Sequence, residues 1–341
     1  MFGKPWREDD VSVRPPTHSN FIEMTTEFAS RIIEVNGINM HIVEAGEGPL
    51  VVLLHGFPEG WYSWRHQLRE LSSNGYHVVA PDQRGYGLTD RPSEIERYSI
   101  FHLVGDVIGL IHGLGEKTAI VVGHDWGAIV AWNTALFRPD VIRGVAALSV
   151  PVKPRLARPP LDVYREAAGP NFYQLYFQEP GVAEREFDQD VRRTVLAILC
   201  AESGDASHVT DQIVGETGLL DTLEILDPLP GWLTDADVDH WAAEFTRTGF
   251  TGGLNWYRNV NRNWELLAPW IDAKVTVPAL YVVGDRDDVY TVPGNQQSAD
   301  RLQQYVPNLT RVVHLEGCGH WTQQERPAEV NDALLQFLRQ F

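Results

Sequence analysis

The chain has 341 residues, of which 43% are hydrophobic, and a formal net charge of −18 at pH 7. This length suits one large catalytic domain with an insertion, or two domains, and the negative charge argues against a nucleic-acid partner because it repels phosphate backbones. The sequence has no run of 18 apolar residues, no visible signal peptide, and too few cysteines (Cys200 and Cys318) for a disulfide framework, so we expect a cytoplasmic protein with no membrane partner.

The first predicted elements follow an N-terminal arm, residues 1–28, in which charged and small polar residues surround two prolines. The alternating segments 31–35 and 39–44 flank Asn36-Gly37, which is typical of a β-hairpin. A continuous apolar run predicts a strand at 50–54 that is buried on both faces. Strands and helices then alternate, with predicted strands at 76–80, 118–123 and 141–150 and predicted helices at 64–71, 99–114 and 127–137.

The alternation stops between residues 151 and 270, where helix formers, aromatic residues and prolines are frequent and no clear strand is visible. We predict that this stretch is a helical cap, or lid, inserted after the sixth strand. The alternation then resumes, with predicted strands at 278–283 and 310–315 and predicted helices near 296–305 and from Pro327 to the end. The whole pattern predicts an α/β fold with an eight-stranded, mostly parallel sheet, built from residues 29–150 and 271–341.

Residues 123–127, Gly-His-Asp-Trp-Gly, join the predicted strand at 118–123 to the predicted helix that follows it. Their spacing is that of a nucleophile elbow, a strained turn, with Asp125 in the place of the usual serine. Aspartate, with an unperturbed pKa of about 3.9, is ionised at neutral pH, and its attack on saturated carbon forms an ester stable enough to be an intermediate. We therefore expect displacement at an sp³ carbon, followed by ester hydrolysis. The alternative is a degenerate elbow that only binds a ligand.

Two candidate partners of Asp125 follow strands later in the chain, where open α/β sheets gather their sites. His320 follows the last predicted strand, and we expect it to take a proton from the water that attacks the ester. An acid must orient the other ring nitrogen of this histidine. Asp285, Asp287 and Asp288 compete for this role, and we favour Asp287, three residues after the glycine that ends the seventh strand, with Asp288 next.

The attack of water creates an oxyanion on the Asp125 carboxyl group, and backbone N–H groups should stabilise it. The N–H of Trp126 is the expected first donor, and the N–H of Phe57, in the segment 55–58, is the expected second. The Phe57-Pro58 bond is a candidate for the cis form.

The leaving group distinguishes two kinds of enzyme. A halide needs no proton, whereas an epoxide oxygen leaves as an alkoxide, whose conjugate acid has a pKa of roughly 15.7, so that a general acid is required. Tyrosine suits this task because it stays protonated at neutral pH. The predicted cap offers tyrosines in the segments 171–177 and 255–259, but composition alone does not separate catalytic tyrosines from structural ones.

Several segments resemble motifs of the α/β-hydrolase-fold epoxide hydrolases of the soluble type, and the similarity covers nearly the whole chain from about residue 30. The segment 55–59, His-Gly-Phe-Pro-Glu, matches the oxyanion motif of that family, in which the Phe-Pro bond is cis. The segment 123–127 matches its nucleophile motif. The segments 284–287 and 317–321 match the motifs of its relay acid and its base.

This resemblance implies that Tyr173, in the segment 172–181, and Tyr257 correspond to the family's two catalytic tyrosines. It implies that Asp125 opens an epoxide ring, that the tyrosines hold and protonate its oxygen, and that the His320–Asp287 pair drives hydrolysis to a vicinal diol. The implied partners are a small apolar epoxide and water, with no cofactor and no metal, in a monomer or homodimer. Further residues implied to shape the site are His55, Pro58, Glu59, His124, Gln174, Phe177, Trp256 and Trp321.

Two other interpretations remain open. A haloalkane dehalogenase would share the elbow and histidine motifs, but that family usually has asparagine where Phe57 stands and lacks the tyrosine pair. A non-catalytic ligand receptor on the same scaffold would be expected to have lost part of the Asp125–His320–Asp287 triad, and none of it is lost here. The sequence alone leaves open which epoxide is bound and with what selectivity.

Overall fold

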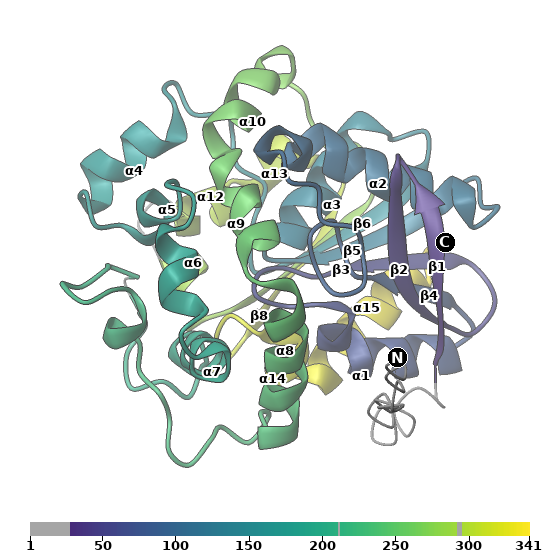
Figure 1. Cartoon of the computed structure of the whole chain (residues 1–341). Coiled ribbons are helices and arrows are strands. Elements are labelled where there is room, and N and C mark those ends of the chain that lie inside the picture. Colours follow the sequence, from purple (N-terminus) through teal and green to yellow (C-terminus); the bar gives the residue numbers. More distant parts are fainter. Residues whose placement is uncertain (1–27, 211, 292–294) are drawn as a thin grey trace, which may run out of the picture.

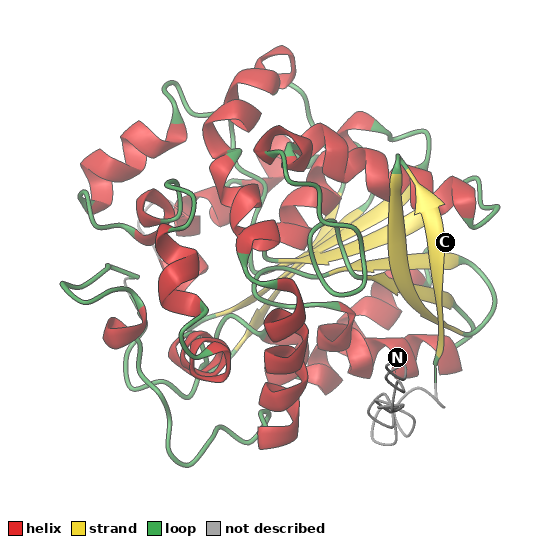
Figure 2. Cartoon of the chain, in the orientation of Figure 1, coloured by secondary structure: helices red, strands yellow, loops and turns green. Residues whose placement is uncertain are grey.

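An eight-stranded sheet runs through the centre of the protein, with helices on both of its faces (Figure 1, Figure 2). The computed structural model describes residues 28–210, 212–291 and 295–341. The predicted N-terminal arm therefore lies outside the described residues, except for Phe28. The strands are β1 (Ala29–Val35), β2 (Ile38–Ala45), β3 (Leu50–Leu54), β4 (His77–Pro81), β5 (Ala119–His124), β6 (Ile142–Leu148), β7 (Ala279–Gly284) and β8 (Leu309–Leu315).

The order of the strands across the sheet is β1-β2-β4-β3-β5-β6-β7-β8. Strand β2 pairs antiparallel with both β1 and β4, and all other neighbours are parallel. In the turn between β1 and β2, Asn36 has φ 47° and Gly37 has φ 74°. These are the left-handed conformations that a two-residue hairpin needs and that these two residue types tolerate. The predicted hairpin and the predicted eight-stranded, mostly parallel sheet are both confirmed.

The helices outside the β6–β7 connection are α1 (Arg65–Ser73), α2 (Ile100–Gly113), α3 (Trp126–Phe137), α11 (Asp288–Thr291), α12 (Asn295–Asp300), α13 (Leu302–Tyr305), α14 (Thr322–Glu325) and α15 (Pro327–Leu338). The prediction of one helix near 296–305 is wrong, because the chain leaves helical geometry at Arg301 (φ −101°, ψ 8°) and forms α12 and α13 instead. Helices α11 and α14 have no predicted counterpart, since four residues are too few to give a periodic pattern. Within the described ranges, no helix combines the length and the apolar character needed to cross a bilayer.

Between β6 and β7, the described residues form the α-helices α4 (Pro160–Ala168), α5 (Tyr173–Tyr176), α6 (Val182–Phe187), α7 (Val191–Ala201), α8 (Asp235–Thr248), α9 (Thr251–Arg258) and α10 (Val260–Leu266). Figure 1 shows most of these teal and green helices on the side of the molecule away from β1 and β2. Short 3₁₀ helices lie in the same segment at Leu220–Thr222 and Ala268–Trp270, and elsewhere at Trp61–Trp64 and Ile95–Tyr98. The segment is helical, as expected, whereas its definition as a cap of residues 151–270 stays a prediction.

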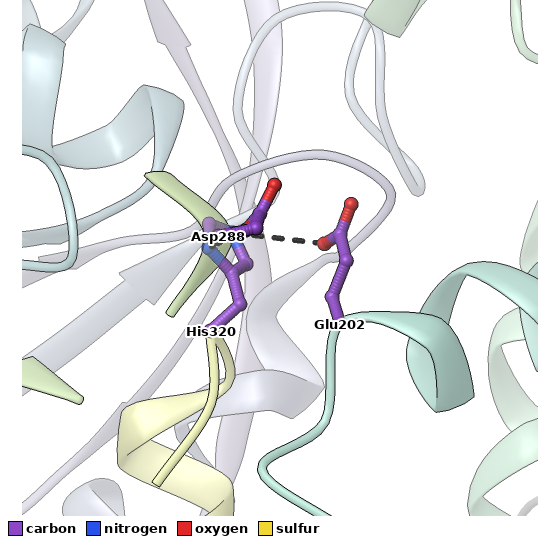
Figure 3. A group of neighbouring side chains, drawn as sticks. All are labelled: Glu202, Asp288 and His320. Atoms are coloured by element: carbon purple, nitrogen blue, oxygen red, sulfur yellow. Dashed lines mark ion pairs between the residues drawn. The ribbon is translucent and has the colours of Figure 1, made fainter. Parts of the chain in front are cut away.

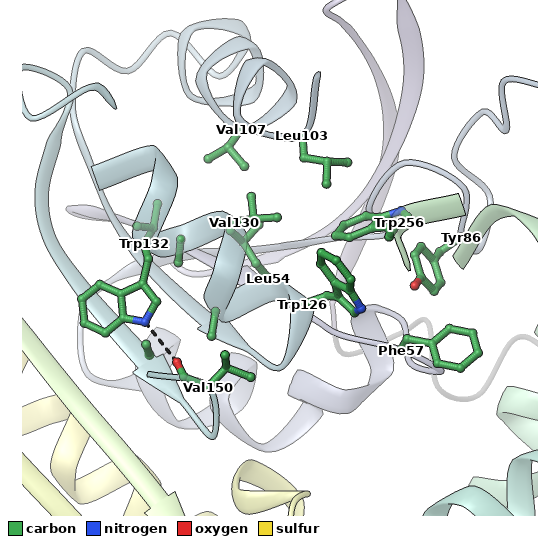
Figure 4. Close-up of a cluster of buried hydrophobic side chains, with 14 of the residues drawn as sticks. Leu54, Phe57, Tyr86, Leu103, Val107, Trp126, Val130, Trp132, Val150 and Trp256 are labelled. Atoms are coloured by element: carbon green, nitrogen blue, oxygen red, sulfur yellow. Dashed lines mark hydrogen bonds between the residues drawn. The ribbon is translucent and has the colours of Figure 1, made fainter. Parts of the chain in front are cut away.

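Successive residues along the central strands enter two hydrophobic clusters, one on each face of the sheet. On β3, Val51 belongs to the cluster shared with α1 and α15, whereas Val52 belongs to the cluster shared with α2 and α3. Figure 4 shows part of the cluster shared with α2 and α3. There, the Trp132 side chain on α3 donates a hydrogen bond to the carbonyl oxygen of Val150 at 3.1 Å. A strand buried on both faces is what the continuous apolar run at 50–54 predicts.

The loops that carry the predicted site follow four strands of the parallel part of the sheet. Phe57 follows β3, Asp125 follows β5, Asp287 follows β7 and His320 follows β8. Because these strands run in the same direction, their carboxyl ends meet at one edge of the sheet and bring the four loops together.

Candidate active site

Asp125 occupies the turn between β5 and α3 in a conformation that residues with side chains rarely adopt, with φ 51° and ψ −121°. The flanking glycines make this turn possible. A Cβ atom on Gly123 would lie 2.1 Å from the carbonyl oxygen of Gly127, and a Cβ atom on Gly127 would lie 2.0 Å from the carbonyl oxygen of Leu54. Strand and helix therefore approach more closely than side chains would allow, and Asp125 reaches the wall of a cavity.

Two backbone N–H groups hold the Asp125 carboxylate. The N–H of Phe57 donates to Oδ1 at 2.9 Å, and the N–H of Trp126, at the start of α3, also bonds the carboxylate. The Phe57-Pro58 bond is cis, as predicted. Burial raises the pKa of Asp125, and the opposing effects of His320 and the two N–H groups do not cancel this increase.

His320 lies in the loop after β8, between Asp125 and a pair of aspartates. Its Nδ1 is 3.1 Å from Oδ1 of Asp287 and 3.6 Å from Oδ1 of Asp288. Its Nε2 is 3.9 Å from Oδ2 of Asp125. Asp287 is held in turn by the N–H of Val289, which donates to Oδ1 at 2.9 Å. These distances favour Asp287 over Asp288 as the acid that orients the imidazole.

The pKa values of the buried groups around His320 are shifted in different directions. Burial lowers the pKa of His320, but Asp287, Glu202 and Asp288 outweigh burial and hold that pKa well above its usual value. Burial raises the pKa of Asp287, but the charge of His320 and the hydrogen bond to it more than offset this effect, so the pKa lies below its usual value. Burial raises the pKa of Asp288 to about 7. At neutral pH, Asp287 is therefore the aspartate of this pair that is fully ionised.

His320 and Glu202 line one cavity, whose empty space is about 460 Å³ including its opening to solvent. Tyr173 on α5 and Tyr257 on α9 line it together with Asp125 and His320. The two tyrosine ring centroids are 6.0 Å apart, and Gln174 donates a hydrogen bond to the Tyr173 hydroxyl at 2.9 Å. Burial holds the pKa of both tyrosines well above the usual value, so both are protonated at neutral pH. The other lining residues are Phe57, Phe177, Ile198, Glu202, Gln212, Leu219, Leu223 and Val289.

A buried hydrogen-bond network joins the loops beside the cavity. Oε2 of Glu59 accepts a bond from the N–H of Gly56 at 2.9 Å and lies 2.8 Å from Nδ1 of His124. Nε2 of His124 lies 2.8 Å from the carbonyl oxygen of His320. Burial raises the pKa of Glu59, but His124 and the hydrogen bonds outweigh burial and lower it to about 2. His55 supports the same loop, since its Nδ1 lies 2.8 Å from the carbonyl oxygen of Gly56.

Comparison with known proteins places the chain in a family. Residues 49–327 match the family model described as the alpha/beta hydrolase fold. The chain is 47% identical over 314 residues to epoxide hydrolase A of Mycobacterium tuberculosis, which covers 90% of this chain and 96% of that protein. It is 45% identical over 316 residues to epoxide hydrolase 2 of Siraitia grosvenorii, which covers 91% of this chain and 98% of that protein. The chain belongs to the α/β-hydrolase-fold epoxide hydrolases.

Solved structures of epoxide hydrolases share the fold of this family member. The structure of epoxide hydrolase A from Mycobacterium thermoresistibile matches it with a TM-score of 0.86 at 48% identity, over 92% of this chain and 98% of that chain. An epoxide hydrolase from Vigna radiata matches it with a TM-score of 0.86 at 44% identity, over 93% of this chain and 99% of that chain. The predicted family and the predicted α/β-hydrolase fold are both confirmed.

Two tryptophans implied by the resemblance to epoxide hydrolases lie behind the cavity wall rather than in it. Trp256 donates from Nε1 to the carbonyl oxygen of Arg84 at 3.1 Å and packs edge-on against Trp126 (Figure 4). Trp321 donates from Nε1 to the carbonyl oxygen of Leu199 at 3.0 Å. Trp321 also packs edge-on against His320, which lines the cavity of this epoxide hydrolase.

Two polar residues of the epoxide hydrolase cavity have no sequence motif that marks them. Glu202, directly after α7, brings Oε2 to 4.0 Å from Nε2 of His320 (Figure 3). Gln212 donates from Nε2 to Oε1 of Glu202 at 2.8 Å and also to Oδ2 of Asp288. Glu202 follows the mostly apolar run 195–201, which is typical of an ordinary buried helix. Sequence reasoning therefore missed it.

Glu202, Asp288 and His320 are also the residues in the described part of the chain that could hold a metal ion, since one ligand atom from each lies within 4.8 Å of the others (Figure 3). The amide nitrogen of Gln212 donates to both carboxylates, and a cation that bound them would have to displace it. Hydrogen bonds from Gln212 thus occupy one oxygen of each carboxylate, and the absence of a metal from the reaction stays a prediction.

Proposed function

We propose that the protein hydrolyses epoxides to vicinal diols through a covalent ester on Asp125. The observation that carries the proposal is the make-up of one cavity wall, which combines a carboxylate at an elbow, a histidine 3.1 Å from a buried aspartate, and two tyrosines. The name epoxide hydrolase, borne by relatives at 44–47% identity, supports the same activity. We also propose that residues 151–270 act as a cap, because both tyrosines come from this segment.

In the first step, Asp125 attacks a carbon of the epoxide ring. The N–H of Phe57 bonds Oδ1, so Oδ2 is the oxygen left to attack. As the ring C–O bond breaks, Tyr173 or Tyr257 gives its phenolic proton to the developing alkoxide. Burial keeps the pKa of both tyrosines well above the usual value, so both hold a proton to donate at neutral pH.

In the second step, water attacks Cγ of the Asp125 ester while Nε2 of His320 takes a proton from it. Asp287 stabilises the imidazolium that forms. The N–H groups of Phe57 and Trp126 donate to the ester oxygen as it becomes an oxyanion. Ester formation also prepares His320 as a base. The Asp125 anion, 3.9 Å from Nε2, no longer raises the pKa of the imidazole once it is esterified.

The two other hypotheses, a haloalkane dehalogenase and a ligand receptor, predict different products from the same cavity. Incubation with an aryl epoxide and, separately, with a primary haloalkane distinguishes them through assays of diol and halide. We expect diol from the epoxide and no halide from the haloalkane. Halide release without diol would favour the dehalogenase, and the absence of both products would favour the receptor.

A single turnover in ¹⁸O-labelled water, with enzyme in excess, tests the ester itself. Hydrolysis breaks the bond between Cγ and Oδ2 of Asp125, so the diol carries away an oxygen of the protein and the water oxygen stays on Asp125. Mass spectrometry of the peptide that contains Asp125 and of the diol measures the two destinations. Label in the diol after one turnover would contradict the covalent mechanism.

A further inference from the structure

Glu202 lines the cavity but has no part in the mechanism above. Its Oε2 lies 4.0 Å from Nε2 of His320 (Figure 3). Oδ2 of Asp125 lies 3.9 Å from the same nitrogen. Both distances are too long for a direct hydrogen bond, but each suits a water molecule bonded to both atoms. The nitrogen that activates the hydrolytic water therefore faces the nucleophile and Glu202 together.

Backbone hydrogen bonds fix the position of Glu202 relative to His320. The N–H of His320 donates to the carbonyl oxygen of Glu202 at 2.9 Å. Beside this bond, Oε2 of the buried Glu325 accepts from the N–H groups of Gly204 and Gly319, at 2.9 Å each. The end of α7 and the loop of the catalytic histidine are thus joined at several points, and the distance between the two side chains is defined.

We propose that Glu202 is a positioning residue for the hydrolytic water, an inference that rests on the proposed epoxide hydrolysis. Gln212 donates to Oε1 of Glu202 at 2.8 Å, which leaves Oε2 for the water. The water donates one hydrogen to Nε2 of His320 and the other to Oε2 of Glu202. With both hydrogens engaged, a lone pair of the water oxygen is left to attack Cγ of the Asp125 ester.

The bond changes balance without a further reactant. The water oxygen bonds to Cγ of Asp125 as one proton moves to Nε2 of His320 and an electron pair of the C=O bond moves to Oδ1. The bond from Cγ to Oδ2 then breaks, and the imidazolium returns its proton to the departing oxygen of the diol. Glu202 only accepts a hydrogen bond from the proton that remains on the water oxygen. Asp125 releases that proton when it becomes a carboxylate again, and the proton restores the phenol of the tyrosine that was deprotonated during ring opening.

The charge of Glu202 changes in the direction that this role requires. The charged groups that face it are Asp288 on α11, Asp287 before it, His320 after β8 and Asp125 after β5. Burial raises the pKa of Glu202 well above its usual value, Asp288 and Asp125 raise it further, and His320 opposes them. Ester formation removes the charge of Asp125, so the pKa of Glu202 falls. The carboxylate therefore becomes a better acceptor at the stage when water must be held.

The variant Glu202→Gln tests the proposal. Because Gln212 donates to Oε1, the new amide should turn its oxygen to Gln212 and its –NH₂ group to the water, which replaces an acceptor by a donor. The rate of ester formation in a single turnover of an aryl epoxide can be measured by rapid quench and intact-protein mass spectrometry. This rate should stay within about twofold of the wild-type rate. Ester hydrolysis should slow by about 10- to 100-fold, and the ester should accumulate.

The pH dependence of ester hydrolysis separates positioning from a merely structural role. In the wild type, this step needs a neutral His320 and an ionised Glu202, so its logarithmic rate should fall on acidification with a slope that approaches about two. In Glu202→Gln, His320 is the one group whose deprotonation this step requires, and the slope should approach about one. Glu202→Asp keeps a carboxylate, so it should keep the steep slope and lose less of the rate.

Glu166→Gln is the matched control, because Glu166 lies on α4 of the same segment with 60% of its side chain exposed. It should change neither step. Hydrolysis at the wild-type rate in folded Glu202→Gln, slower ring opening in place of slower hydrolysis, or a shallow slope in Glu202→Asp would each overturn the proposal. If Glu202→Gln shows no cooperative unfolding, the variant is not properly folded. The slope of the pH dependence of ester hydrolysis in Glu202→Asp then decides between positioning and a structural role. A wild-type protein that forms neither ester nor diol would instead refute the proposed function.

Discussion

Nδ1 of His124 lies 2.8 Å from Oε2 of Glu59, and both side chains are fully buried. The other ring nitrogen of His124 lies 2.8 Å from the carbonyl oxygen of His320. Both nitrogens thus face oxygen atoms that can accept a hydrogen bond. Glu59 also accepts from the N–H of Gly56, beside the oxyanion donor Phe57. The buried contact between Glu59 and His124 therefore connects the loop after β3, the end of β5 and the loop of His320.

Glu59→Gln should destabilise the fold, because it removes a buried carboxylate that contacts both Nδ1 of His124 and the N–H of Gly56. Breaking a buried pair costs about 3–5 kcal/mol, which denaturant unfolding at neutral pH would measure. Folding lowers the pKa of Glu59 from 4.5 to about 2, so its stabilisation is present above pH 4.5 and is lost as the pH falls toward 2. The difference between variant and wild type should therefore shrink in acid. Glu166→Gln removes only an exposed contact with Arg158 and should change the stability far less, and an equally stable Glu59→Gln would contradict the structural importance of the buried contact with His124.

Replacement of both Tyr173 and Tyr257 by Phe should abolish ring opening, because the alkoxide would leave without a proton donor. General acids contribute about 10²- to 10⁴-fold, so each single variant should retain part of the rate of ester formation. Tyr176→Phe is the matched control, since the Tyr176 hydroxyl donates to Oε2 of Glu186 at 2.8 Å and Tyr176 does not line the cavity. Ester formation at the wild-type rate in the double variant would refute the assigned role of the tyrosines.

Asp287→Asn and Asp288→Asn should differ strongly in ester hydrolysis. Asp287 is ionised and lies 3.1 Å from Nδ1 of His320, and an amide at this position stabilises the wrong tautomer, with an expected loss of about 10⁴-fold. The pKa of Asp288 is about 7, so an amide resembles the neutral form that is already populated at neutral pH, and the loss should be much smaller. Single-turnover measurement of ester decay compares the two variants. The opposite order would make Asp288 the orienting acid.

The sheet, and the meeting of Asp125, Asp287 and His320 at one edge of it, could be predicted because strands obey simple rules. The apolar run at 50–54 coincides with a strand whose residues are all buried. Asp125, Asp287 and His320 each follow a strand of the parallel part of the sheet. Parallel strands bring their carboxyl ends to one edge, so residues far apart in the sequence are expected to meet there. Their catalytic roles stay predictions.

The position of Glu202 could not be predicted, because it depends on how a helix packs. Nothing in the sequence aligns the end of α7 with the loop after β8. That alignment comes from side-chain contacts such as the bond from Trp321 to the carbonyl oxygen of Leu199. Gln212 reaches the same place from an irregular segment between α7 and α8. The sequence pattern predicts where parallel strands end at the edge of a sheet. No comparable pattern predicts where the end of a helix between β6 and β7 will lie.

Gly127→Ala tests whether the elbow depends on the close approach of α3 to β3. A Cβ atom here would lie 2.0 Å from the carbonyl oxygen of Leu54 and 2.6 Å from that of His55. Both atoms belong to the backbone, so no side chain can turn away. Overpacking typically costs about 1–3 kcal/mol, and the necessary shift of α3 would move Asp125 away from the N–H of Phe57.

We therefore expect Gly127→Ala to unfold at a lower temperature and to form little ester. Gly231→Ala is the matched control, because a Cβ atom at Gly231 would meet nothing within 4 Å, and this variant should change neither quantity. Loss of ester formation without loss of stability would mean that the methyl group is accommodated by a shift confined to the elbow. Wild-type stability together with wild-type ester formation would contradict the requirement for glycine at this position.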